Sequence, residues 1–314
     1  MKKLILSGAF LLSFILFSCS PYKNLTDMEF EEIPYPFEVK KVSLSDTMTI
    51  AYADLGTGKQ TIIFIHGLGS YLPAWKKNLP ELSKNYRCIA IDLPGYGKSS
   101  KKPHSGMMDF YADVLIKFMD ELKLKSAVIA GHSMGGQIAM VAALKYTNRI
   151  DKLILVSPAG FETYSPGEKQ WFRDAMTTAS VKNTSARQIR INLVNNFYNM
   201  PADAEFMVTD RLAMRNAKDF DNYCYNVARS VHGMVDQPVY DLLDKIKQPT
   251  LIVFGEKDNL IPNPYLTGGK TVDIAMIGKE KIPDSKLVMI PDAGHFVMFE
   301  KSEIFNQSVV DFLK

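Results

Sequence analysis

A serine in a tight, glycine-rich turn is the first feature of the sequence that could do chemistry. Residues 131–135 read Gly-His-Ser-Met-Gly; they follow an apolar run at 127–130 and open a helix-like stretch at 136–146. A Gly-x-Ser-x-Gly turn between a strand and a helix is typical of a nucleophile elbow, in which small residues accommodate the strained serine backbone. The helix that follows directs free N–H groups and the positive end of its dipole at any oxyanion formed there. We therefore predict that Ser133 is a nucleophile; the alternative is a glycine-rich turn with an incidental serine.

A serine hydroxyl is a weak nucleophile near neutral pH, so Ser133 needs a base, and histidine has the suitable pKa. Of the five histidines in the sequence, His295 is the predicted base. It lies in a loop at 291–296 that follows the last strand-like run, and therefore at the carboxyl end of a strand. The other histidines are expected elsewhere. His132 points away from the serine, His66 holds a loop, His104 lies on a surface loop, and His232 is packed or solvated in a helical insert or lines the pocket.

The base in turn needs a carboxylate that fixes its tautomer and stabilises the imidazolium. Residues 251–258 end a strand in a turn, and Asp258 falls on the same sheet edge as His295. Glu256 is the nearest rival and Asp236 a more distant one. Asp92 also ends a strand, but we expect it to brace its own loop. Asp258 is therefore the predicted orienting carboxylate.

An oxyanion formed at Ser133 needs two hydrogen-bond donors, one from the residue after the nucleophile and one from a loop after an earlier strand. The backbone N–H groups of Met134 and Leu68 are the predicted donors. Leu68 lies in the segment His-Gly-Leu-Gly-Ser at 66–70, whose glycines let the backbone approach a substrate closely. The neighbouring residues expected to line the substrate site are His66, Gly67 and His132.

Short apolar runs alternate with amphipathic stretches, a pattern that predicts a parallel sheet covered by helices. An amphipathic helix is expected over 108–122, and antiparallel strands over 42–53 at one edge. Between 161 and 247 no strand-like run occurs, which predicts a helical cap over the carboxyl edge of the sheet, where α/β proteins bind ligands. The strand candidates are 61–65, 88–91, 127–130, 153–156, 251–254 and 287–290.

Five motifs, in order and at their intervals, resemble those of the α/β-hydrolase fold superfamily: HGLGS at 66–70, DLPGYGKS at 92–99, GHSMGG at 131–136, FGEKD at 254–258 and PDAGH at 291–295. More narrowly, the chain resembles capped members such as bacterial esterases and C–C bond hydrolases, from about residue 42 to 314 apart from the cap. The resemblance implies a mostly parallel, eight-stranded sheet flanked by helices, with the cap inserted after the sixth strand. It also implies a catalytic triad in the family's chain order, Ser133, Asp258 and His295.

Two further features refine the resemblance. The nucleophile is serine where haloalkane dehalogenases and epoxide hydrolases carry aspartate, so those activities are disfavoured. The segment 262–283, between the predicted acid and base, is longer than usual and is expected to add a loop at the rim of the pocket.

The N-terminus is typical of a secretory signal peptide. Lys2 and Lys3 precede a mostly apolar, uncharged run at 4–17, which is shorter than the roughly 20 residues needed to span a bilayer. Residues 16–19, Leu-Phe-Ser-Cys, resemble the lipobox of bacterial lipoproteins, which implies that Cys19 becomes the lipidated first residue of the mature chain. The alternatives are a plain signal peptide, with Cys19 incidental, or an uncleaved anchor. The predicted organisation is a signal peptide at 1–18, a proline-containing tether at 19–41, a core at 42–160 and 248–314, and a cap at 161–247.

Composition and residue spacing argue against nucleic-acid binding and against a metal or organic cofactor. A net charge of +3 on 314 residues gives no basic footprint for nucleic acid, which is excluded as a partner. Cys19, Cys88 and Cys224 form neither a disulfide framework nor a paired metal spacing, and acidic residues and histidines show no ligand spacing, so no metal or organic cofactor is expected.

The predicted function is a serine hydrolase that cleaves a small or medium apolar carboxylic ester through an acyl-enzyme. The alternatives keep the triad but change the bond, to C–C cleavage, amide or N-terminal proline cleavage, or perhydrolysis. A further alternative, which is not an enzyme, is a lipid-anchored binding protein. The expected partners are a small-molecule substrate and, through a lipid on Cys19, a membrane of the cell envelope, on the periplasmic side or at the outer membrane.

Overall fold

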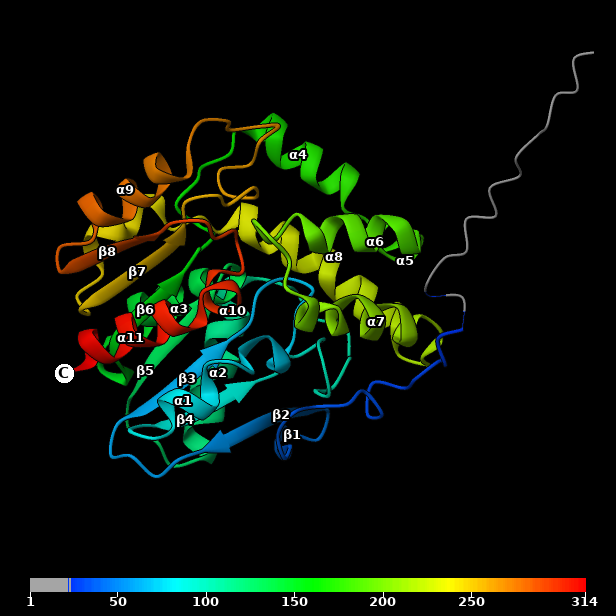
Figure 1. The fold of residues 1–314 in the computed structure, drawn as a ribbon, viewed down its shortest axis with the longest axis horizontal. Helices are drawn as coiled ribbons and strands as arrows, with labels where there is room; N and C mark the ends of the chain where they lie inside the picture. Colours follow the sequence, from blue (N-terminus) through cyan, green and yellow to red (C-terminus); the bar gives the residue numbers. More distant parts are fainter. Residues whose placement is uncertain (1–21, 23) are drawn as a thin grey trace, which may run out of the picture.

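An eight-stranded, mostly parallel sheet forms the centre of the molecule, in a computed structural model that describes residue 22 and residues 24–314. The strand order is β1-β2-β4-β3-β5-β6-β7-β8 (Figure 1). The pairs β1–β2 and β2–β4 are antiparallel, and all other neighbours are parallel. The predicted sheet, with its antiparallel edge, is therefore confirmed. The strands are β1 (Lys40–Ser45), β2 (Met48–Leu55), β3 (Thr61–Ile65), β4 (Arg87–Ile91), β5 (Ala127–His132), β6 (Ile150–Val156), β7 (Thr250–Gly255) and β8 (Ser285–Ile290).

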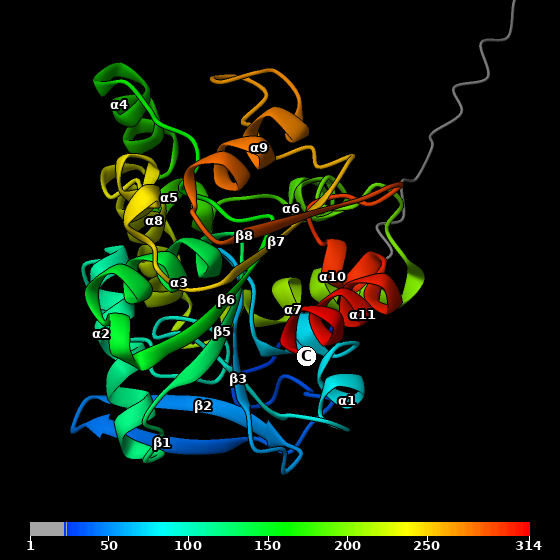
Figure 2. The same ribbon diagram turned by 90° about the vertical axis from the view of Figure 1, so that its left-hand side faces the viewer.

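Helices cover both faces of this sheet, which explains why the central strands carry apolar residues at successive positions. In β3, Ile63 and Ile65 face one layer of the core, and Ile62 and Phe64 face the other. One face carries α2 (Met108–Glu121), α3 (Met134–Lys145) and α9 (Thr271–Lys281); the other carries α1 (Leu79–Leu82), α10 (Val297–Glu300) and α11 (Ser302–Leu313) (Figure 2).

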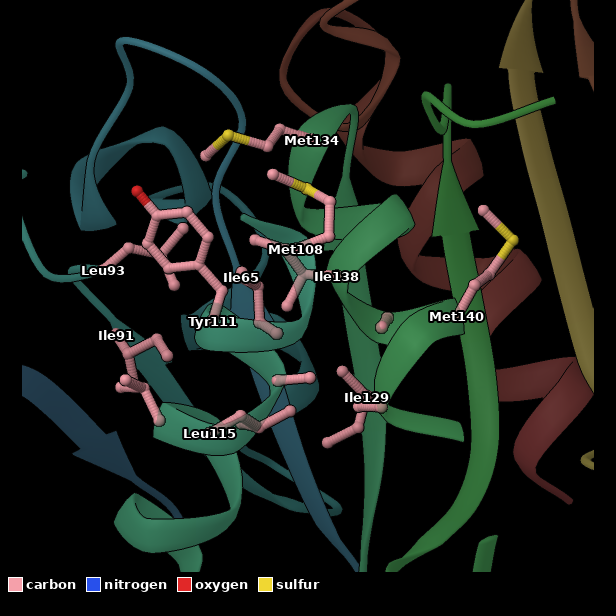
Figure 3. Packing of buried hydrophobic residues seen from close by; sticks show 14 of the residues in the cluster. Ile65, Ile91, Leu93, Met108, Tyr111, Leu115, Ile129, Met134, Ile138 and Met140 are labelled. Carbon is pink, nitrogen blue, oxygen red and sulfur yellow. The ribbon is translucent and has the colours of Figure 1, made fainter. Parts of the chain in front are cut away.

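The packing of α2 shows what holds these layers together. Its buried side chains recur at helical spacing, and Tyr111 and Leu115 belong to the same buried cluster as Ile91 and Ile129 of the sheet (Figure 3). Full burial of each large apolar side chain stabilises the fold by about 1.5–3 kcal/mol. The predicted helix over 108–122 is therefore confirmed to within one residue.

A helical cap lies between the sixth and seventh strands along the chain, as predicted. Residues 157–249, all of which the structure describes, contain no strand. Side-chain caps fix the starts of three cap helices, since the Ser165, Thr177 and Ser185 hydroxyls each accept a hydrogen bond from an N–H three residues later. The cap helices are α4 (Pro166–Ala175), α5 (Thr178–Lys182), α6 (Ala186–Val194), α7 (Phe206–Ala213) and α8 (Phe220–Asp236). Short 3₁₀ helices complete the chain: η1 (Leu72–Trp75), η2 (Thr147–Arg149), η3 (Ala202–Ala204), η4 (Met214–Asn216) and η5 (Tyr240–Lys245).

The segment before β1 packs on the domain, so the prediction of a tether over 19–41 is wrong for its later part. Phe30 and Ile33 are only 4% and 2% exposed, and the Phe30 ring packs on Tyr223 of the cap at a centroid distance of 5.6 Å. The N–H of Met28 donates to the carbonyl of Ala213 at 3.0 Å. Prolines in this segment prevent a periodic pattern but not the burial of single apolar side chains. From about residue 28, the segment is therefore part of the folded domain, and β1 already begins at residue 40.

The predicted signal peptide and Cys19 lie outside the described residues. Within the described part of the chain, no helix combines the length and the apolar character needed to cross a bilayer.

Candidate active site

The turn between β5 and α3 holds Ser133 in a strained backbone conformation, with φ 53° and ψ −116°. Such a conformation is costly for a residue with a side chain. The turn is tight because a Cβ on Gly131 would lie 2.2 Å from the carbonyl oxygen of Gly135, and one on Gly135 would lie 2.4 Å from that of Ile65. The helix begins at Met134, two residues earlier than predicted, because Ser133 itself takes the position before its first turn.

His295 and Asp258 meet at the carboxyl edge of the sheet. His295 follows β8 and Asp258 follows β7, two neighbouring parallel strands. The Nδ1 of His295 lies 2.8 Å from Oδ2 of Asp258, and these side chains are 4% and 0% exposed. The other oxygen of Asp258, Oδ1, accepts hydrogen bonds from the N–H groups of Leu260 at 2.8 Å and Ile261 at 3.1 Å. This arrangement holds the proton on Nδ1 and leaves Nε2 able to accept one.

The two rival carboxylates lie elsewhere. Glu256 is exposed to solvent on the same turn as Asp258. Asp236 ends α8 and pairs with Arg173 at 2.5 Å on the surface. Asp92 braces its own loop, as expected: Oδ1 accepts from the N–H of Leu72, and Oδ2 accepts from the N–H of Lys98 and the hydroxyl of Tyr35, each at 2.7 Å.

One cavity of about 580 Å³ joins these residues. Ser133, His295, Gly67, Leu68 and His132 all border it. Among the described residues the Ser133 hydroxyl has no hydrogen-bond partner, which is common for a nucleophile without bound substrate. The cavity lies between the sheet edge and the cap, and its cap-side lining includes the apolar side chains Phe172, Ile191, Val231, Met234 and Val235.

The predicted oxyanion donors are the backbone N–H groups of Met134 and Leu68, both in segments next to Ser133. Met134 is the first residue of α3, where N–H groups have no acceptor within the helix. Leu68 lies in the loop after β3, which packs on the elbow so closely that a Cβ on Gly67 would lie 3.1 Å from that of Ser133. In the part of the chain that the structure describes, neither the Leu68 nor the Met134 N–H has an acceptor. Both N–H groups are therefore free of protein acceptors within the described residues, and their binding of an oxyanion stays a prediction.

His66 is placed differently from the prediction that it lines the substrate site. It is fully buried and does not border the cavity. Its Nδ1–H donates to the carbonyl of Gly67 at 2.8 Å, and its Nε2 accepts from the N–H of Leu93 at 3.1 Å. Burial lowers its pKa. His66 therefore holds two loops together, as expected, and the prediction that it also lines the substrate site is wrong.

His132 borders the cavity but turns toward the His295 loop. Its Nε2–H donates to the carbonyl of His295 at 3.0 Å. Burial, and then the neighbouring His295, lower its pKa well below the ordinary value, so it is neutral. Of the remaining histidines, His232 bonds the carbonyl of Met176, while His104 lies in a loop, as predicted, and stacks on Phe110 at a centroid distance of 4.6 Å.

Three charged residues near the cavity were not predicted. Glu162 and Arg211 border the catalytic cavity and the neighbouring cap cavity, respectively. Glu300 ties the His295 loop to the cap: its carboxylate accepts from the N–H groups of Gly294 at 2.8 Å, Tyr198 at 3.0 Å and Asn199 at 2.6 Å. No sequence pattern marks Glu162 or the link from Glu300 to the cap, because the partners in these contacts lie about a hundred residues away along the chain.

Arg211 of α7 is a partly buried cation that forms no salt bridge with a carboxylate among the described residues. Its Nη1 is buried with no hydrogen bond, and its guanidinium lies 4.2 Å from the centre of the Tyr223 ring. Burial lowers its pKa to about 10. Arg211 borders the cap cavity, of about 360 Å³. Four residues border both this cavity and the catalytic one: Leu68, Asn192, Asn196 and Phe296.

No group of three or more metal-ligating side chains occurs within the described residues.

Comparisons with known proteins agree with this architecture. The model of the alpha/beta hydrolase fold family matches residues 60–302. A dihydrolipoyllysine-residue acetyltransferase component of the acetoin cleaving system of Pseudomonas putida is 28% identical over 260 residues, which are 82% of this chain; the match spans only 65% of that longer protein. The 2-hydroxy-6-oxononadienedioate/2-hydroxy-6-oxononatrienedioate hydrolase of Escherichia coli is 28% identical over 281 residues, covering 85% of this chain and 91% of that protein.

Among solved structures, a Pseudomonas aeruginosa protein described as a "probable hydrolytic enzyme" superposes with a TM-score of 0.83 at 25% identity. The superposition covers 92% of this chain and 99% of that one.

Proposed function

Because the chain belongs to the α/β-hydrolase fold family, we propose that it is a serine hydrolase that cleaves a small or medium apolar carboxylic ester. One observation carries the proposal. The buried 2.8 Å pair of His295 and Asp258 borders the same site as Ser133, which sits in a strained turn. Strain and a buried, oriented histidine are costly to maintain, and they are typical of catalytic sites.

The proposed reaction has two steps. Ser133 Oγ attacks the ester carbonyl while His295 Nε2 takes its proton, and Asp258 stabilises the resulting imidazolium. The N–H groups of Leu68 and Met134 bind the oxyanion. The imidazolium then protonates the leaving alkoxide, which leaves an acyl-enzyme. In the second step His295 takes a proton from water, the hydroxide attacks the acyl carbon, and Ser133 recovers its proton as the acid departs.

The cavity lining supports an apolar acyl group. Side chains of Phe172, Ile191 and Met234 border the space above Ser133. Burying an apolar chain against them would contribute about 0.8 kcal/mol for each CH₂ group. The volume of about 580 Å³ is in the range of small-molecule binding sites.

Arg211 favours a second candidate function, in which the same triad acts on a different bond. An unpaired guanidinium in a cavity next to the catalytic one is suited to a substrate that carries a carboxylate. The Escherichia coli relative is named as a hydrolase of dioates, which are such compounds. Cleavage of a C–C bond in a carboxylate-bearing substrate is therefore the alternative.

The position of Tyr22 bears on the proposed lipid anchor. Its ring packs against the cluster of Ile189, Val208 and Leu212 in the cap, and its hydroxyl bonds Glu205. Cys19 precedes Tyr22 by three residues, which span about 11 Å at most. Acyl chains on Cys19 would therefore hold the cap close to the membrane surface. Cys19→Ser is expected to move the protein from the membrane fraction to the soluble one, and an unchanged distribution would refute the anchor.

The decisive experiment compares p-nitrophenyl esters of rising acyl length with monoesters of dicarboxylic acids. Ser133→Ala should abolish turnover of both, with an almost unchanged thermal melt. Arg211→Met should lower kcat/KM for the dicarboxylic monoesters by about 100-fold, the contribution of a bidentate, charge-assisted contact, and leave neutral esters within about threefold. If no ester is cleaved while a fluorophosphonate labels Ser133, the bond is of another kind. If neither occurs, a non-catalytic role is favoured.

A further inference from the structure

Glu162 is a buried carboxylate that the proposed mechanism does not use. It follows β6, is 8% exposed and borders the catalytic cavity. Its Oε1 accepts hydrogen bonds from the N–H of Asn263 at 2.9 Å and from the hydroxyl of Thr267 at 2.6 Å. Burying a carboxylate is costly unless donors compensate it, and these two donors come from one loop about a hundred residues away along the chain.

That loop is the rim segment, which we define as residues 259–270, between β7 and α9. Its middle is a compact turn organised by Asn263, whose Oδ1 accepts from the N–H of Tyr265 at 3.0 Å and whose carbonyl accepts from that of Thr267 at 3.1 Å. Among the described residues, Glu162 accepts every hydrogen bond that joins residues 262–269 to the rest of the chain. The turn is thus preformed, and Glu162 fixes where it lies.

The rim segment forms the outer wall of the catalytic cavity. Leu260 and Tyr265 both border the cavity, yet they are 37% and 85% exposed. Side chains so placed would contact a substrate only if its acyl chain extended out to the mouth. The far end of the segment has room to move, since a Cβ on Gly268 would meet no atom within 4 Å.

We infer that Glu162 is a specificity-determining residue: it fixes residues 262–269 of the rim segment so that Tyr265, next to Leu260, contacts acyl chains long enough to reach the mouth. Glu162 does not contact the reacting atoms. It acts through the two hydrogen bonds to Asn263 and Thr267. The inference rests on the proposed hydrolase function of Ser133 for the identity of the ligand.

The test uses the full chain and two fluorophosphonates, one with a methyl and one with a decyl chain, which label an activated serine. Glu162→Ala is expected to lower the ratio of decyl to methyl labelling rates by about tenfold, the lower range for losing a hydrogen bond to a charged group. Glu162→Gln should keep most of the ratio, because its carbonyl can accept the same two bonds. Thr267→Val should fall between them, and Glu256→Ala is the matched control on an exposed carboxylate.

Hydrogen exchange at the Asn263 amide provides a second readout, which does not depend on activity. Glu162→Ala should speed this exchange by about tenfold or more, and Glu162→Gln should not. An unchanged labelling ratio, an equal slowing of both reagents, or an unchanged exchange rate would overturn the inference. If Glu162→Ala does not fold, Thr267→Val decides. If neither reagent labels the wild-type protein, the proposed function fails, and the exchange rate alone decides whether Glu162 holds the rim segment.

Discussion

Replacing Asp258 by asparagine tests the predicted role of the carboxylate with little change of shape. In the structure, Oδ1 accepts from the N–H groups of Leu260 and Ile261, and Oδ2 faces Nδ1 of His295 at 2.8 Å. An asparagine has only one oxygen that can accept from the two backbone donors, so its NH₂ group must point at His295. His295 then has to accept at Nδ1 and carry its proton on Nε2. That is the atom that must take the proton from Ser133.

We expect kcat of Asp258→Asn to fall by about 10⁴-fold, the effect of holding such a histidine in the wrong tautomer. The free energy of unfolding should fall by only about 1–2 kcal/mol, because the backbone hydrogen bonds to Leu260 and Ile261 remain. The assay is hydrolysis of p-nitrophenyl butyrate together with urea unfolding. Glu256→Gln, on the exposed neighbouring carboxylate, is the control and should stay within about twofold. An Asp258→Asn enzyme within about tenfold of the wild-type kcat would refute the reasoning.

Three other predictions follow from close contacts and buried groups. Gly135→Ala should lower the free energy of unfolding by about 3 kcal/mol, since the new Cβ would lie 2.4 Å from a backbone oxygen, whereas Gly167→Ala, with no atom within 4 Å, should raise it by about 0.5–1 kcal/mol; similar effects in urea unfolding would contradict this. Burial lowers the pKa of His104 to about 4, so below about pH 6.5 the unfolded chain binds a proton at this histidine and the folded chain does not. The free energy of unfolding should therefore fall by up to about 3 kcal/mol between pH 6.5 and 4. An equally large loss in His104→Gln would show that His104 is not its source. Glu300→Ala should lower kcat by up to about 100-fold for short and long esters alike, because it frees the loop that carries His295; an effect confined to long esters would argue against this role.

Much of the fold could be predicted because its signals are local. The central strands carry apolar residues on both faces, which only a doubly covered sheet requires, and five of the six strand candidates differ from the structure by at most two residues at each end; β6 begins three residues earlier than predicted. The segment before β1 shows the limit of this approach. Phe30 and Ile33 are buried as single residues between prolines, so they leave no period to detect. Their partners, such as Tyr223, lie nearly two hundred residues away.

The candidate site divides in the same way. Ser133, Asp258 and His295 each follow a recognisable strand, and parallel strands bring their carboxyl ends to one edge, so their proximity was predictable; their catalytic role stays a prediction that Asp258→Asn tests. The sequence predicted that His66 holds a loop, but not that it faces away from the substrate site. Whether a loop histidine faces the substrate or the next loop depends on the register of two loops, here those of Gly67 and Leu93, which sequence spacing does not fix.

Hydrogen bonds from backbone N–H groups to three carboxylates hold the loops of this site in place. Asp258, Glu162 and Glu300 each accept hydrogen bonds from backbone N–H groups of loops that border the reacting centre. Asp258 and Glu162 are buried, so no water competes for these donors, whereas Glu300 is partly exposed and relies on three charge-assisted bonds. Glu300 joins the His295 loop to the cap at Tyr198, and the N–H of Phe296 adds a 2.9 Å bond to the carbonyl of Asn196. The cap therefore cannot shift at this point without moving the segment that carries His295, so a substrate that displaces α6 would also change the placement of the base.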